Sequence, residues 1–151
     1  MSGYNTPRGL RNNNPLNIKR TGKDSWLGMS AVQEDKTFVQ FMNMEYGWRA
    51  AFVILRNYYF KHGIHTIREI VKRWAPSSEN DTDAYVSSVC RHTGLSADYS
   101  LLSPDERPGR WISIGYAMAC VENGFTGFNI KEMLKGYDAA KIANKKKTDT
   151  T

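Results

Sequence analysis

The sequence lacks the features of a membrane-spanning or disulfide-stabilised protein. Its 151 residues contain no apolar run approaching the roughly 20 residues that span a bilayer, and no signal-like apolar run lies near the start. The two cysteines, Cys90 and Cys120, lie in apolar helical patterns, so buried, reduced thiols are expected. We therefore expect cytoplasmic synthesis; delivery to a cell wall would need a virion, a holin or a secretion apparatus.

Recognisable motifs for metal, cofactor and nucleotide chemistry are also missing. His62 and His65 are three residues apart, but Gly63 interrupts the helix that would align them, and His92 has no ligand pattern beside it. The chain has no glycine loop for phosphate and no G-x-S-x-G elbow. A cysteine–histidine nucleophile pair remains an alternative to core thiols. We expect neither a metal ion nor a cofactor.

The composition is that of one soluble globular domain. Hydrophobic residues make up 40% of the chain and charged residues 24%, which is ordinary for a packed core of this size. The net charge of +6 owes much to the lysines of the final segment NKKKTDTT. We expect a single domain over residues 1–143 and a basic, disordered tail over 144–151. Nucleic-acid binding is therefore the least favoured alternative, and no pattern indicates an oligomeric state.

Helical periodicity dominates the chain after a short polar start. Residues 24–41 contain β-compatible pieces broken by a glycine and a polar turn, which predicts a small hairpin or β-wing. Five helices are then predicted, at about residues 45–62, 67–75, 82–93, 111–121 and 129–140. Thr66 and Glu69 form a capping box for the second of them. The expected fold class is α+β, predominantly helical.

Carboxylates set among aromatic and amide side chains are the remaining candidates for chemistry, and they suit cleavage or binding of a glycan. Glu79 lies close to Trp74, but just before a predicted helix N-terminus, where the dipole lowers a carboxyl pKa. It could serve as a base, an electrostatic stabiliser or a cap. Glu45 opens an aromatic-rich helix, and Asp35 belongs to a polar turn. A general acid would need a raised pKa.

Two segments carry a resemblance to known proteins: RNNNPLNIK at residues 11–19 and WAPSSENDT at residues 74–82. With the anchors between them, they resemble a family of small phage and prophage proteins, often labelled virion structural proteins, over about residues 8–89. That family is similar to the lysozyme-like superfamily. In cell-wall glucosaminidases an NN-x-F-x-I-K segment precedes a β-wing, and in lytic transglycosylases E-T-x-x-Y-V follows an aromatic-Ala-Gly/Pro turn. The resemblance implies a lysozyme-like single domain with a glycan cleft.

One departure from those enzymes leaves three alternatives open. Their catalytic glutamate ends a helix that precedes the NN segment, whereas here only MSGYNTPRGLR precedes it, without any acidic residue. Either the acid has moved to Glu45, Glu79 or Asp35, or the fold is permuted, or the chain binds glycan without cutting it. The asparagines also have a purely structural interpretation, because asparagine favours turns and tolerates left-handed backbone.

The leading hypothesis is a phage or prophage peptidoglycan-degrading glycosidase or lytic transglycosylase that cleaves the β-1,4 bond between amino sugars. Glu79 is the first candidate for the catalytic carboxylate and Glu45 the second. The residues expected to hold the sugar are Asn13, Asn14, Trp26, Trp74 and Tyr85. A non-catalytic virion or cell-wall-binding module is the alternative from another class.

Overall fold

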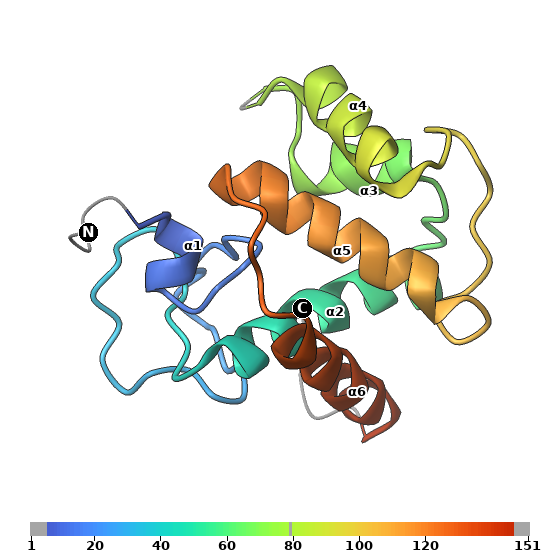
Figure 1. The fold of residues 1–151 in the computed structure, drawn as a ribbon. Helices are drawn as coiled ribbons and strands as arrows, with labels where there is room; N and C mark the ends of the chain where they lie inside the picture. Colours follow the sequence, from blue (N-terminus) through green and yellow to red (C-terminus); the bar gives the residue numbers. More distant parts are fainter. Residues whose placement is uncertain (1–5, 79, 147–151) are drawn as a thin grey trace.

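In the part of the chain that the structure describes, six helices are joined by irregular segments. The computed structural model describes residues 6–78 and 80–146. The helices are α1 (Arg8–Arg11), α2 (Met44–Phe60), α3 (Ile67–Trp74), α4 (Thr82–Thr93), α5 (Pro108–Asn123) and α6 (Ile130–Lys146) (Figure 1). No β-strand occurs within the two described stretches. The protein is therefore all-α, and the expected α+β class with an N-terminal β-wing is wrong.

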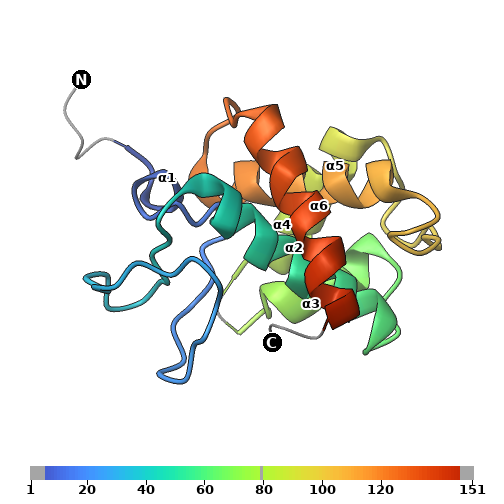
Figure 2. The same ribbon diagram turned by 90° about the horizontal axis from the view of Figure 1, so that it is seen from below.

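The central helix is α2, which forms where large apolar residues recur at helical spacing. Trp48 and Phe52 are fully buried on it and stack on each other. Asn43 caps its first turn, because its side chain accepts a hydrogen bond from the backbone N–H of Tyr46. Helix α6 packs across α2, and α5 also contacts it (Figure 2). The core helix predicted over 45–62 is confirmed.

Helices α3 and α4 form a pair that packs on α5 through α4. The Thr66 side chain accepts a hydrogen bond from the Glu69 backbone N–H, so the predicted cap of α3 is confirmed. Helix α3 ends at Trp74, two residues before Pro76, as expected from the steric effect of proline on the preceding backbone. Helix α4 ends at Thr93 and is capped by Gly94, which takes a left-handed φ of 75°.

The two C-terminal helices are longer than the periodicity predicted. Helix α5 begins three residues before the predicted stretch 111–121 and ends two residues after it. Helix α6 continues to Lys146, so residues 144–146, expected in the tail, are helical. Residues 147–151 lie outside the described part of the chain. No described helix combines the length and apolarity needed to cross a membrane.

The segment between α1 and α2 is irregular and contains the predicted hairpin region. Its only bridges are two isolated antiparallel pairs, Lys19 with Phe38 and Met29 with Phe41. They lie too far apart in the segment to build a continuous ladder. The stretches around residues 19–29 and 38–41 therefore lie beside each other without forming a sheet.

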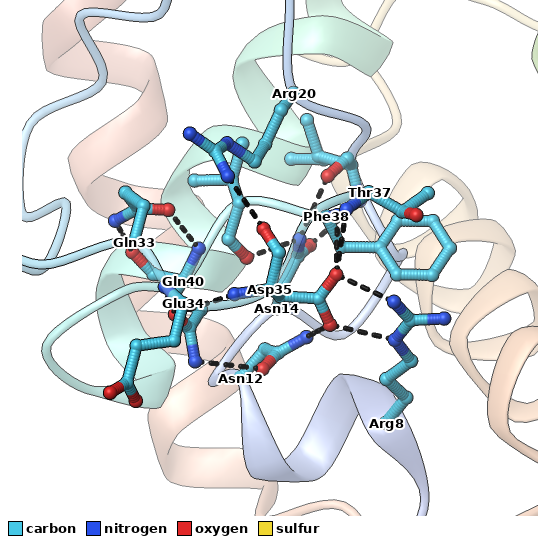
Figure 3. Close-up of polar contacts among 12 residues, drawn as sticks. Arg8, Asn12, Asn14, Arg20, Gln33, Glu34, Asp35, Thr37, Phe38 and Gln40 are labelled. Carbon is cyan, nitrogen blue, oxygen red and sulfur yellow. Dashed lines mark hydrogen bonds and ion pairs between the residues drawn. The ribbon is translucent and has the colours of Figure 1, made fainter.

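Side chains take the hydrogen-bonding places that a β-ladder would fill. Asn14 is fully buried; its amide donates to the carbonyl oxygens of Ile18 and Val39 and accepts from the N–H of Ile18. The Asp35 carboxylate accepts hydrogen bonds from two backbone N–H groups that follow it in the chain (Figure 3). Such local bonds compete with strand pairing, which is why β-compatible residues here do not form a β-wing.

The asparagines at residues 12–17 are explained largely by the backbone conformation that this segment adopts. Asn13 and Asn17 both take a left-handed φ of 53°, a region that asparagine tolerates better than other non-glycine residues. The Asn13 carbonyl lies so close to Gly47 of α2 that any side chain there would collide with it. These features fold the N-terminal segment tightly onto the first turn of α2.

Candidate functional site

A cavity of about 440 Å³ lies where the N-terminal segment meets the ends of α3 and α5. The described residues that line it are Asn17, Ile18, Lys19, Phe38, Trp74, Ala75, Pro76, Asn80 and Glu122. Glu122 is the only acidic residue among them. We call this space the Glu122 cavity. Its walls combine an indole and a phenyl ring with amide groups, a mixture suited to a ligand with both apolar faces and hydroxyl or amide edges.

Glu122 is held by donors from three different parts of the fold. Its Oε2 accepts a hydrogen bond of 3.1 Å from the Trp74 indole N–H and one of 3.0 Å from the Tyr85 hydroxyl. Its Oε1 is 3.3 Å from the Asn17 amide nitrogen, which donates to it. The carboxyl group is thus fixed in position at the cavity wall by α3, α4 and the N-terminal segment.

The pKa of Glu122 is raised above its ordinary value. Burial is the main cause, because it disfavours the charged carboxylate. The hydrogen bonds from Asn17, Tyr85 and Trp74 and the charge of Lys19 act in the opposite direction, but do not cancel the effect. Glu122 also lies next to the last residue of α5, where the negative end of the helix dipole opposes a carboxylate. These are conditions under which a carboxyl group can keep a proton to donate.

Contacts made by Asn123, the residue after Glu122, bring Glu122 to the N-terminal segment. The Asn123 side chain accepts a hydrogen bond from the Gly9 N–H at 2.9 Å and donates to the Pro15 carbonyl at 2.8 Å. Gly9 is needed at this point because an added Cβ would collide with the Asn123 amide. The end of α5 and the segment after α1 are therefore joined although more than 100 residues separate them (Figure 1).

Asn17 at the wall of the cavity has one unfavourable feature. Its Oδ1 is buried with no hydrogen-bond partner among the described residues. A buried acceptor left unpaired costs about 1–3 kcal/mol. An unsatisfied buried polar atom calls for an explanation such as a functional role, so Asn17 supports the view that this cavity has a role beyond stability.

A second cavity, of about 500 Å³, adjoins the first and shares Ile18, Lys19 and Trp74 with it. The other described residues that line it are Thr21, Lys23, Asp24, Ser25, Trp26, Ile54, Tyr58, His62 and Arg73. We call it the outer cavity. The two cavities are therefore neighbours, and Trp74 belongs to the wall of each.

The sugar-binding residues expected from the sequence fall into two groups. Trp74 and Tyr85 meet at the Glu122 carboxyl, and Trp26 lines the outer cavity. Asn13 and Asn14 do not line either cavity. The Asn13 amide donates to the Phe41 carbonyl, and Asn14 is fully buried with its amide bonded to backbone groups. The structure gives these two asparagines a structural role.

The acidic residues considered from the sequence lie elsewhere. Glu45 is half-exposed on α2, with its carboxylate 3.7 Å from the Lys135 ammonium, and does not line the Glu122 cavity. Asp35 forms a two-pronged ion pair with Arg8 at 2.6 and 2.7 Å, which holds the pKa of its carboxyl far below the usual range (Figure 3). Asp35 is therefore ionised and unable to act as a general acid near neutral pH. Glu79 lies outside the described residues.

Other chemistries find little support in the described part of the chain. No group of three or more His, Cys, Asp or Glu side chains there is placed to hold a metal ion. Cys90 and Cys120 are free thiols, and burial raises the pKa of both. A raised thiol pKa disfavours the nucleophilic thiolate.

Sequence reasoning missed Glu122, Asn17 and Lys19. A signal for Glu122 was present: it is the only acidic residue of α5, placed near the C-terminal end of a helix that is apolar and aromatic over most of its length. A carboxylate is unfavourable at that end of a helix, so its presence there is a cue to function. Nothing in the sequence indicates that this helix end meets residue 17.

Comparison with known proteins places the chain among phage proteins. No protein-family model matches it. It is 41% identical over 133 residues to Protein P5 of Pseudoalteromonas phage PM2, an alignment that covers 87% of this chain and 80% of the phage protein. The chain belongs to the P5 family. The expected phage association is thereby confirmed, while the name of the P5 relative states no activity, so any chemistry has to be argued from the Glu122 site.

Proposed function

We propose that this P5-family protein cleaves the glycan of bacterial peptidoglycan, with Glu122 as the general acid. The observation that carries the proposal is a carboxyl group of raised pKa, fixed at the wall of a cavity that is bounded by an indole and amide groups. Glycosidic bonds break when a protonated carboxyl group donates to the departing oxygen. Indole and amide groups suit the faces and the acetamido groups of amino sugars.

The hydrogen bonds indicate which oxygen of Glu122 carries the proton. The Trp74 indole can only donate, and it donates to Oε2 together with the Tyr85 hydroxyl. Oε2 is therefore an acceptor, and the proton of the neutral form belongs on Oε1. Oε1 has only the longer contact with the Asn17 amide, so it is the oxygen available to a substrate.

One carboxyl group is sufficient for a lytic transglycosylase. Hydrolysis in the usual manner needs two carboxylates on opposite sides of the bond. The described lining of the Glu122 cavity contains Glu122, while Glu79, between the lining residues Pro76 and Asn80 in sequence, lies outside the described residues. We propose a lytic transglycosylase, in which Glu122 protonates the departing oxygen and then, as a carboxylate, takes the proton of a hydroxyl on the same sugar as that hydroxyl attacks the anomeric carbon.

The spatial order of the elements supports the same proposal. In the cell-wall enzymes that the sequence resembles, a catalytic glutamate ends a helix that leads into the NN segment. Here Glu122 nearly ends α5 and lies against the NN segment through Asn17, although α5 comes much later in the chain. The proximity of Glu122 to the NN segment supports the permuted alternative, in which Glu122 would take the place of the upstream acid.

The test is the release of soluble muropeptides from purified sacculi, measured by chromatography from pH 4 to 8. The wild-type protein should release them, and Glu122→Gln should lose about 10²–10⁴-fold, the usual contribution of a general acid. Glu45→Gln is the matched control and should remain active, and Glu79→Gln tests the residue favoured by sequence. No release by the wild type at any pH would favour a non-catalytic binding module. Full activity of Glu122→Gln would refute the site.

A further inference from the structure

The outer cavity differs from the Glu122 cavity in its charge. Lys19, Lys23 and Arg73 lie in its described lining, against Asp24 as the single acidic residue. The Asp24 carboxylate accepts hydrogen bonds from the backbone N–H and the hydroxyl of Thr21, which orient it but leave its charge in place. One carboxylate against three cationic side chains gives the described lining of the outer cavity a net positive formal charge.

The cations are arranged around aromatic walls. Trp26 and Trp74 line the outer cavity together with Tyr58, over whose ring the Arg73 guanidinium lies at 5.4 Å. Arg73 and Lys23 are exposed at the surface and belong to different segments, α3 and the loop before Trp26. A ligand that enters the outer cavity thus meets apolar surface and positive charge together.

The position of the outer cavity limits what it could take. It adjoins the cavity where the sugar bond would be cut, so its ligand is most simply a substituent or a neighbouring unit of the same glycan. A nucleic acid needs cations along an extended face, whereas here they surround one hollow. Carboxylates attached to a sugar fit both the charge and the proximity.

We propose that the outer cavity binds carboxylate groups carried by the glycan, so that the protein selects carboxylate-bearing amino-sugar strands over neutral ones. This inference rests on the proposed function for the identity of the glycan, but not for the chemistry of the outer cavity. Lys23 and Arg73 supply the attraction, and the two indoles hold the attached apolar groups. The carboxylates have two sources in peptidoglycan: the lactyl group of the sugar itself and the peptide that extends from it.

The experiment measures binding by calorimetry with the Glu122→Gln protein, so that no ligand is consumed. The ligands are chitotetraose, which has no carboxylate, peptide-free peptidoglycan tetrasaccharide, which has lactyl carboxylates, and the same tetrasaccharide with its peptides. At low salt we expect carboxylate-bearing ligands to bind about ten-fold more tightly than chitotetraose. Lys23→Glu and Arg73→Gln should each remove most of this preference, and Lys131→Glu on the exposed side of α6 should leave it unchanged.

The outcomes separate this inference from the proposed function. Equal affinity for all three ligands, or a preference unaffected by both substitutions, would overturn it even if the wild type cleaves sacculi. If the wild type cleaves no sacculi but prefers carboxylate-bearing ligands in a way that depends on Lys23, this inference would be supported and the proposed enzymatic function refuted. If only the peptide-bearing tetrasaccharide binds more tightly than chitotetraose, the carboxylates bound in the outer cavity are those of the peptide. Lys23-dependent binding of a DNA oligonucleotide, with no preference among glycans, would overturn the inference in favour of nucleic acid.

Discussion

Tyr85→Phe tests the physics of the Glu122 site without knowledge of any substrate. The substitution keeps the buried ring and removes only the hydroxyl that donates to Glu122 Oε2 at 3.0 Å. That hydroxyl stabilises the carboxylate and lowers its pKa. Without this hydrogen bond, fewer interactions offset the effect of burial, which disfavours the carboxylate. The pKa of Glu122 should therefore rise further in the variant.

The expected magnitude follows from the charge state of Glu122. A hydrogen bond to a charged group contributes about 1.5–3 kcal/mol, and one between neutral groups about 0.5–1.5 kcal/mol. Tyr85→Phe should therefore reduce the free energy of unfolding by about 1–1.5 kcal/mol more at a pH where Glu122 is ionised than at a pH where it is protonated. In the wild type, a raised folded-state pKa contributes stability that is fully present below the unfolded-state pKa and lost as pH rises through the folded-state pKa. The variant should lose more of this stability at high pH.

The assay is urea denaturation of both proteins at several pH values between 4 and 8. Tyr99→Phe is the matched control, because its hydroxyl accepts a hydrogen bond from the Arg110 guanidinium and not one involving a carboxyl group. Its effect should be small and independent of pH. If Tyr85→Phe destabilises the protein equally at all pH values, or more at low pH, the assignment of a titrating, hydroxyl-bonded Glu122 is refuted.

Two further predictions concern stability. Glu122→Gln should be more resistant to thermal unfolding than the wild type near neutral pH, because it removes a buried carboxylate of raised pKa. This difference in stability should vanish once the pH falls below the unfolded-state pKa of the carboxyl group. A difference that persisted at such a pH would contradict the explanation. Asn14→Ala should lower the free energy of unfolding by about 2–6 kcal/mol in urea, because it leaves the Val39 carbonyl and the Ile18 N–H buried without partners, at about 1–3 kcal/mol each. The Ile18 carbonyl keeps its hydrogen bond from the Val39 N–H. A loss below about 1 kcal/mol would contradict the structural role of Asn14.

The helices were predictable because their signals are local. The Thr66 cap, the Pro76 stop and the Gly94 turn each depend on residues within a few positions of one another, and all three have the expected effect. The β-wing was not predictable in the same way. Its residues suit strands, but Asn14 and Asp35 bond to the backbone and leave only isolated bridges.

The candidate site could be predicted only in part. Trp74 and Tyr85 were identified because the segment around them resembles part of a glycan cleft, and both contact Glu122. Glu122 itself was passed over, since its significance depends on a contact with Asn17 across 105 positions of the chain. Glu45 was favoured by its aromatic neighbours in sequence, yet it pairs with Lys135 and does not line the Glu122 cavity.

By itself, the sequence determined the helical core, the helix ends and the presence of asparagines able to adopt left-handed backbone, because these follow from short-range sterics and hydrogen bonding. The tertiary structure alone decided which acidic side chain lies buried at the wall of a cavity. The contacts of Asn123 with Gly9 and Pro15 carry the end of α5 to the asparagine segment, and burial at that junction raises the pKa of Glu122. A pKa of this kind belongs to an environment assembled from distant parts of the chain, so no local pattern could have revealed it.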